Sequence, residues 1–216
     1  MLLLVLGLLL FVGAHSIRIV AENKRSEWIS RIGPLGYKAA CALVSLIGLL
    51  LIIKGYGEAR AQPVALWPAW SAGRHIAALL SLIAFVLIAA AFVPGSRLRA
   101  RLRHPMVLAV KLWAVGHLAA NHTLADLVLF GSLLVWAVLS FRAARRRDRL
   151  VGAAIPERGA LPTEAAEGPP EGALQVAPAP AGSVFSDLLA LAIGGSAYWA
   201  FAFHLHASWI GVRPFG

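Results

Sequence analysis

The chain has 216 residues, of which 59% are hydrophobic and only 14% are charged, and its mean hydropathy is +0.75. This composition is too apolar for a water-soluble domain or a disordered chain, and a single cysteine excludes an internal disulfide. A net charge of +10 would suggest a nucleic-acid partner on a soluble protein. On a membrane chain it instead reports which loops are cytoplasmic. We therefore expect a membrane protein surrounded by the lipid bilayer, with no nucleic-acid partner.

Six apolar stretches approach the about 20 residues that a helix needs to cross a bilayer. In chain order they are Met1 to about Val20, Leu35–Ile53, His75–Val93, Pro105–Ala120, Leu124–Phe141 and Val184 to about His206. The first has no basic leader region and no small-residue cleavage site, which favours a retained helix over a signal peptide. The fourth is short and contains Lys111, but the tight turn after it is typical of a helical hairpin. The sequence predicts an all-α, polytopic membrane helix bundle of about six transmembrane helices.

The segment 151–183 differs from the rest of the chain. It holds six of the twelve prolines, together with nine alanines and five glycines. Such a stretch cannot bury enough apolar surface to order itself, so we expect a flexible linker. The five helices in residues 1–150 and the sixth helix and tail in residues 184–216 then form one membrane domain. Ser183 is placed to cap the sixth helix, with Asp187 in its first turn.

The basic residues are distributed unevenly between the loops. The loops after the first, third and fifth helices contain fifteen of the twenty Lys and Arg residues, whereas the opposite side contains four and Lys111 lies within a helix. Lys and Arg accumulate in cytoplasmic loops. We therefore expect the odd-numbered loops in the cytoplasm and both termini on the non-cytoplasmic side.

The chain contains seven histidines, which is unusual in so apolar a sequence. An ionisable side chain inside the bilayer is costly unless it faces a partner, a cavity or a metal. His15 and His117 lie within predicted helices, where each is either a functional ligand or a neutral imidazole bonded to a neighbouring helix. The other five lie at helix ends, where contact with water or headgroups is the simpler interpretation: His75, His104, His122, His204 and His206. The sequence has no CxxCH, CxxC, HExxH, Walker or GxGxxG motif.

Several distinct short motifs are spread over nearly the whole chain outside 151–183. They are His15-Ser16, His104-Pro105, Trp113-Ala-Val-Gly-His117-Leu118 followed by Asn121, Phe130-Gly131, and His206 ahead of Ile210-Gly211-Val212-Arg213-Pro214. Together these motifs resemble the NnrU family of integral membrane proteins. The resemblance implies a bacterial inner-membrane protein linked to denitrification, which handles nitrite or nitric oxide beside denitrification enzymes or a redox partner.

The NnrU family is related to 15-cis-zeta-carotene isomerase, a membrane enzyme that contains haem b. The resemblance implies a b-type haem here, with its iron held by His15 and His117. In the isomerase, a cysteine three residues before the second histidine is the proposed exchange ligand. That position is Ala114 in this chain, which departs from the isomerase pattern.

The expected depths of the two histidines differ. His15 lies about 5 residues from the cytoplasmic end of its helix and His117 about 12, a difference of roughly 10 Å at 1.5 Å per residue. A tilted or longer first helix would close this gap. Otherwise His117 needs a different partner, and the alternatives are His75, His206 and His104. Either Arg18 or Arg74 could pair with haem propionates.

Three functions remain open on the sequence alone. The first is a haem protein with redox or isomerase-type chemistry on an apolar substrate. The second is a non-catalytic accessory protein for nitrite or nitric oxide reductases. The third is a small-solute transporter, suggested by Lys111, Asn121 and Asp126, although no internal repeat supports it.

Overall fold

The computed structural model describes residues 1–154 and 182–215. Within these residues the chain is built of helices joined by short turns and by one longer loop at 62–72, which confirms the all-α fold. The elements are α1 (Leu2–Val20), α2 (Glu22–Ala61), α3 (Gly73–Phe92), α4 (Arg97–Leu102), α5 (Pro105–Ala120), α6 (Leu124–Ala154), α7 (Val184–Ala200), the π-helix η1 (Phe201–Leu205) and α8 (His206–Ile210). Most of the expected linker at 151–183 lies outside the described residues.

Five helical stretches are long and apolar enough to cross a membrane. They are Leu2–Val20, Glu22–Ala61, Gly73–Phe92, Leu124–Leu150 and Val184–Ile210. The shorter α5 has 16 residues, which reach about 24 Å at 1.5 Å per residue. It packs between α3 and α6. The described part of the chain thus forms a multi-pass bundle of five long helices and this shorter one.

The helices pack in a row whose order differs from the order of the sequence. From one side of the bundle to the other, the adjacent helices are α2, α1, α6, α5, α3 and α7.

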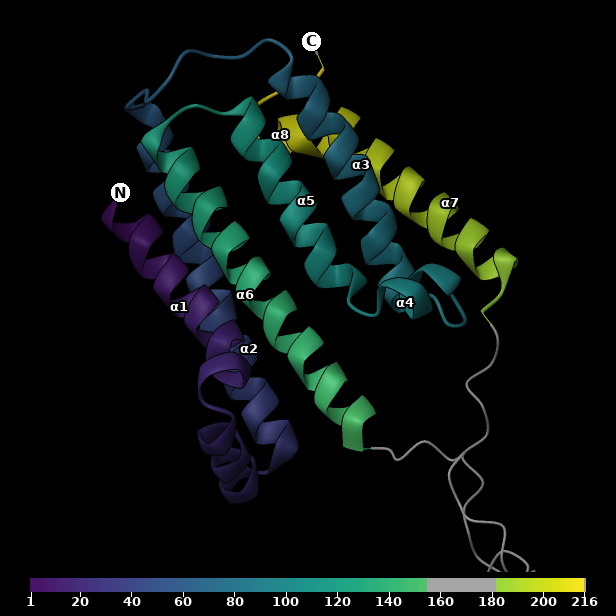
Figure 1. Ribbon diagram of the computed structural model, residues 1–216. Coiled ribbons are helices and arrows are strands. Elements are labelled where there is room, and N and C mark those ends of the chain that lie inside the picture. Colours follow the sequence, from purple (N-terminus) through teal and green to yellow (C-terminus); the bar gives the residue numbers. More distant parts are fainter. Residues whose placement is uncertain (155–181, 216) are drawn as a thin grey trace, which may run out of the picture.

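Figure 1 shows both termini at the upper end of the bundle. The turns after α1 and α3 and the end of α6 lie at its lower end. The loops in which arginine and lysine accumulate therefore share one end of the bundle, as the charge distribution predicts.

Small residues allow the helix backbones to approach closely. A Cβ atom on Gly7 of α1 would lie 2.6 Å from the backbone nitrogen of Ile52 and 2.7 Å from the carbonyl oxygen of Gly48, both in α2. A Cβ on Gly194 of α7 would lie 2.5 Å from the Cα of Val86 in α3. Between helices in lipid there is little hydrophobic driving force, so such close backbone contact is a main source of association.

Helices α2 and α6 extend beyond the apolar stretches that mark them in the sequence, and α6 continues to Ala154. α2 begins at Glu22 and bends at Gly33, which has a φ of 75° and is followed by Pro34. The part before the bend is charged and carries ion pairs from Arg25 to Glu22 (2.8 Å) and from Arg31 to Glu27 (2.6 Å). Hydropathy marks only the apolar part of a helix, whereas charged residues with high helix propensity continue it into water.

The start of α7 follows the prediction. The Ser183 hydroxyl accepts a hydrogen bond from the backbone N–H of Phe185 at 3.1 Å, which makes it the expected N-cap. Asp187 in the first turn accepts hydrogen bonds from the Ser96 hydroxyl (2.9 Å) and the Leu98 backbone N–H (3.2 Å). These bonds fix the start of α7 against α4.

Candidate functional site

A cavity of about 250 Å³ lies between α3, α5 and the C-terminal segment, by which we mean the end of α7, η1, α8 and the tail that follows (residues 198–215). We call it the aromatic cavity. Its lining is dominated by aromatic and small apolar side chains, together with two histidines and two arginines. The residues are Arg74, Ala77, Ala78, Ser81, Phe85, Trp113, His117, Ala120, Asn121, Tyr198, Phe201, Ala202, His206, Val212, Arg213 and Pro214.

His117 reaches the aromatic cavity from α5. Its Nδ1 lies 2.9 Å from the carbonyl oxygen of Trp113, one turn earlier. The imidazole also packs against the rings of Trp113 and Phe130, with centroid distances of 4.7 and 4.8 Å. Because Nδ1 is engaged as a donor, Nε2 carries the free lone pair. Among the described residues, Nε2 of His117 has no hydrogen-bond partner.

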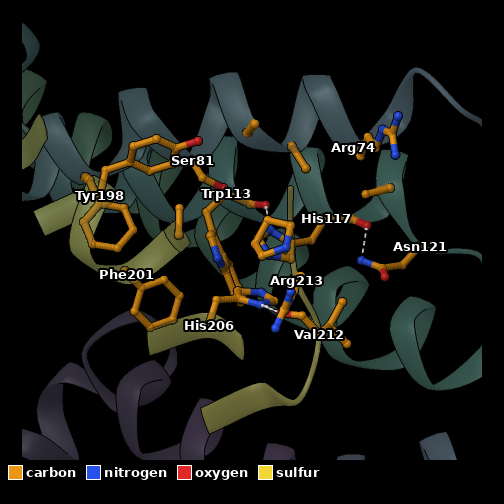
Figure 2. A pocket seen from close by; sticks show the side chains of 16 residues that line it. Arg74, Ser81, Trp113, His117, Asn121, Tyr198, Phe201, His206, Val212 and Arg213 are labelled. Atoms are coloured by element: carbon orange, nitrogen blue, oxygen red, sulfur yellow. Dashed lines mark hydrogen bonds between the residues drawn. The ribbon is translucent and has the colours of Figure 1, made fainter. Parts of the chain in front are cut away.

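His206 reaches the same cavity from the C-terminal segment, where it follows the π-helix η1 directly. Its Nδ1 lies 2.7 Å from the carbonyl oxygen of Val212. That carbonyl faces back because the chain reverses at Gly211, whose φ is 78°. A single π-helical turn shifts the register of the residues after it, and such turns are frequent at functional sites. Figure 2 shows His117, His206 and Arg213 among the side chains that line this pocket.

The polar groups of the aromatic cavity are few. Arg74 comes from the first turns of α3 and Arg213 from the C-terminal tail. Within the described part of the chain, neither arginine pairs with a carboxylate. The Asn121 side-chain amide donates to the carbonyl oxygen of His117 at 2.8 Å and closes the end of α5. Two imidazoles, two unpaired guanidinium groups and aromatic walls match the chemistry of a porphyrin with two propionates.

A second cavity, of about 720 Å³, lies between α1, α6 and the turn from α4 to α5. We call it the basic cavity. Three arginines and two histidines line it, with a single carboxylate. The residues are His15, Arg18, Ile19, Arg103, His104, Val107, Ser140, Ala144, Arg147 and Asp148.

The one carboxylate of the basic cavity is already engaged. The Asp148 Oδ2 lies 3.0 Å from Nε2 of His104 and 3.7 Å from Nη1 of Arg103. His15 is tied to its own helix instead, with Nδ1 2.7 Å from the carbonyl oxygen of Phe11. Its ring lies edge-on to Trp136 of α6, at a centroid distance of 5.8 Å.

The structure distributes the predicted site residues between the two cavities. His117, His206 and Arg74 line the aromatic cavity. His15, His104 and Arg18 line the basic cavity. The predicted pair of His15 and His117 therefore does not share a cavity, and of the alternatives only His206 lines the cavity that contains His117. His75, in the first turn of α3, is exposed and outside the aromatic cavity.

The residues that suggested a transport path have structural partners. Lys111 lies over the ring of Phe141, with Nζ 4.4 Å from the ring centroid. Asp126 is buried; it accepts hydrogen bonds from the Tyr56 hydroxyl at 2.5 Å and the Thr123 hydroxyl at 2.6 Å. It therefore ties the first turn of α6 to Thr123, which precedes the helix, and links α6 to α2. Across residues 1–154 and 182–215, no group of three or more His, Cys, Asp or Glu side chains could hold a metal ion.

Sequence reasoning did not assign a role to Arg213, Tyr198 or Phe201. All three come from the C-terminal segment and line the aromatic cavity. Arg213 carried a usable signal, because it stands in an apolar tail seven residues after His206. The two aromatic residues carried none, since their sequence positions resemble those of any membrane helix.

The fold and the site define a multi-pass membrane helix bundle with a histidine-lined cavity near one end. A family model described as "NnrU protein" matches residues 3–214. The chain therefore belongs to the NnrU family. A search of curated proteins and a search of solved structures each found no match.

Proposed function

We propose that this protein binds b-type haem in the aromatic cavity, where His117 and His206 would hold the iron, and that it serves nitrite or nitric oxide metabolism in denitrification. The observation that carries the haem proposal is the shared cavity of these two histidines. The link to denitrification rests on the resemblance to the NnrU family.

The hydrogen bonds of the two histidines support the proposal. In each ring Nδ1 is directed to a backbone carbonyl, of Trp113 for His117 and of Val212 for His206. Such a bond fixes the tautomer and the orientation of a metal-binding imidazole and makes it a stronger ligand. Both rings therefore offer Nε2, and they do so from different elements that meet at one cavity.

The size of the cavity sets a condition on binding. Its volume of about 250 Å³ lies just below the about 300–1,000 Å³ of typical small-molecule sites. A porphyrin therefore requires the cavity to widen. The tail after Gly211 forms one wall through Val212, Arg213 and Pro214. We expect this wall to move outward on binding, because it is a short irregular segment rather than a packed helix.

A bound b-type haem would supply one-electron redox chemistry. The protein groups have separate tasks. His117 and His206 would hold and orient the haem, and the rings of Trp113 and Phe201 would exclude water from the cavity. Arg74 and Arg213 offer two positive charges to the propionates of the ligand. Burial and hydrogen bonding at such a site tune the redox potential.

The isomerase-type alternative has less support. Its proposed exchange ligand is a cysteine where this chain has Ala114, which is completely buried. An alanine methyl group provides no ligand atom. The transporter alternative is weakened because Lys111 and Asp126 have partners within the bundle.

A visible spectrum tests the haem proposal. The wild-type protein, purified in mild detergent, is expected to give b-type bands in the reduced-minus-oxidised difference spectrum. His117→Ala and His206→Ala are each expected to lose these bands or to shift to a five-coordinate spectrum. His204→Ala is the matched control, because His204 is two residues from His206 but exposed and outside the aromatic cavity. Unchanged bands in both ligand variants would contradict the proposed site.

The denitrification proposal needs a separate measurement. A strain that lacks the gene is expected to consume nitrite or nitric oxide more slowly under oxygen limitation. Wild-type protein should restore the rate, whereas His206→Ala should not and His204→Ala should. Normal rates in the deletion strain would contradict the physiological role and leave the haem site to be judged by its spectrum.

A further inference from the structure

The basic cavity is lined by more positively charged side chains than negatively charged ones. Of its three arginines, only Arg103 pairs with the single carboxylate, Asp148. Arg18 and Arg147 have no carboxylate partner within the described part of the chain. Unbalanced guanidinium groups around a cavity attract anions, and a phosphate group matches their geometry best.

Two buried polar atoms beside the basic cavity lack partners. Ser140 lines the basic cavity and is only 8% exposed, and its hydroxyl has no hydrogen-bond partner among the described residues. The same holds for the indole N–H of Trp136, one turn away on α6. An unsatisfied buried group usually indicates a missing ligand or water. Both atoms could bond an acceptor from a molecule that enters between α1 and α6.

Two further apolar cavities lie beside the basic cavity between α1 and α6, and we call the two together the furrow. The nearer one, of about 380 Å³, shares Ile19 with the basic cavity and has Trp136 in its wall. The other, of about 310 Å³, shares Val12 and Ser132 with the nearer one. The furrow is lined mainly by aliphatic residues of the two helices and reaches Val5 of α1.

The dimensions of the furrow suit an acyl chain. From Ile19 to Val5 the furrow follows α1 over fourteen residue-to-residue steps, or about 21 Å at 1.5 Å per residue. Half of the roughly 30 Å hydrocarbon core is about 15 Å, so the furrow can hold one chain across its leaflet. Along α6 the order is also that of a phospholipid. Arg147 and Ser140 come first, then the indole N–H of Trp136, then the apolar wall.

We propose that the basic cavity and the furrow together bind one anionic phospholipid from the leaflet next to the arginine-rich loops. The phosphate is held by Arg18, Arg147 and Ser140, an ester carbonyl accepts from Trp136, and one acyl chain fills the furrow. Basic pockets between transmembrane helices on the cytoplasmic side bind anionic headgroups in this way. A free phosphate would not contact the apolar furrow, whereas the acyl chain of a lipid would fill it, so the furrow favours a lipid. The site shares no lining residue with the aromatic cavity.

The first test measures lipid binding to the delipidated full-length protein by native mass spectrometry. The probes are phosphatidylglycerol, phosphatidylcholine with the same acyl chains, and inorganic phosphate. The wild-type protein is expected to bind one phosphatidylglycerol at least tenfold more tightly than phosphatidylcholine, and phosphate only weakly. Equal binding of the two lipids, or phosphate binding as tight as that of phosphatidylglycerol, would overturn the proposal.

Paired variants separate the charge from the furrow. Arg18→Gln with Arg147→Gln is expected to weaken phosphatidylglycerol binding about thirtyfold, because each basic residue near a membrane surface contributes about fivefold. Arg142→Gln with Arg146→Gln is the matched control, since both arginines are exposed and outside the cavity. Equal loss in both pairs would overturn the site, because it indicates a general effect of surface charge.

A third variant tests the furrow itself. Ser132→Phe places a ring where the two apolar cavities meet, and it leaves the arginines in place. It is expected to weaken phosphatidylglycerol binding without changing phosphate binding. Unchanged lipid binding would place the acyl chain elsewhere and overturn the assignment. Loss of haem bands rather than lipid from the Arg18 and Arg147 variant would assign the basic cavity to haem, and would overturn the lipid proposal.

Discussion

The aromatic and basic cavities contain the same kinds of polar residue but in different surroundings. Each has two histidines and at least two arginines. In both cavities histidines direct Nδ1 to backbone carbonyls, His117 and His206 in the aromatic cavity and His15 in the basic cavity. The rest of the aromatic cavity is lined mainly by aromatic and small apolar side chains. In the basic cavity His104 is engaged by Asp148, and the arginines outnumber the carboxylate. These surroundings are the reason why we propose the haem in the aromatic cavity and the anionic lipid in the basic cavity.

This comparison shows that a histidine inside a membrane helix is not assigned by its depth alone. His15 and His117 both lie within apolar stretches of the sequence, at different expected depths. His15 is exposed at the surface of its helix and belongs to the basic cavity, whereas His117 is packed between Trp113 and Phe130. The second residue of a ligand pair is found by asking which histidine meets it at one cavity.

The largest expected effect comes from removing histidines from one cavity at a time. His15→Ala together with His104→Ala is expected to keep the full b-type spectrum, because neither residue lines the aromatic cavity. His117→Ala together with His206→Ala is expected to abolish it. Haem content per protein, measured by pyridine haemochrome, reports both outcomes. If the first pair removes the haem and the second does not, the roles of the two cavities are reversed.

A smaller effect is expected from Asp126, a buried carboxylate that lines neither cavity. Asp126→Ala leaves the hydroxyls of Tyr56 and Thr123 without their acceptor. The free energy of unfolding is expected to fall by about 3 kcal/mol, because a buried unsatisfied donor costs about 1–3 kcal/mol. Thermal unfolding in detergent measures this loss. The folded fraction should keep its haem bands, and their selective loss would show that Asp126 belongs to the haem site.

The next effect distinguishes the cavities through helix packing. A Val side chain at Gly194 would collide with the backbone of Val86 and push α7 away from α3. Overpacking of this kind costs roughly 1–3 kcal/mol, so we expect about 2 kcal/mol of lost stability. Gly194→Val should also weaken haem binding, since α3 and α7 both line the aromatic cavity.

Gly7→Val is the matched control for that experiment. It disturbs the contact of α1 with α2 by the same kind of collision, but Gly7 lines neither cavity. The expected result is a similar loss of stability with haem affinity preserved. Equal haem loss in both variants would indicate that affinity follows overall stability rather than the shape of the aromatic cavity.

The sequence predicts the fold well because membrane helices obey strong rules. Apolar length located every long helix, and the distribution of Lys and Arg placed the loops at opposite ends of the bundle. The charged part of α2 before the bend at Gly33 and the extension of α6 to Ala154 were missed. Hydropathy marks where a helix is apolar, and these segments are charged. Only their helix propensity would have revealed them.

The site was harder to predict because it depends on which helices become neighbours. The resemblance named His15 and His117, with His75, His104 and His206 as alternatives, but the sequence does not state that α7 packs against α3. That contact comes from Gly194 and Ala190, whose small size carries no sign of which helix they will meet. The register shift at η1, which precedes His206, is likewise a product of local packing rather than of a motif.

The smallest expected effect tests the hydrogen bond that orients His206. Gly211 has a φ of 78°, and an alanine in this left-handed region costs about 1–2 kcal/mol. Gly211→Ala should therefore displace the carbonyl of Val212 from Nδ1 of His206 without removing either ligand. We expect haem affinity to fall about fivefold and the reduced bands to shift slightly, whereas lipid binding at the basic cavity should not change. Gly57→Ala, at a helical position with open space around it, is the control. If Gly211→Ala behaves like this control, the Val212 carbonyl does not orient the ligand, and His206 owes its direction to η1 alone.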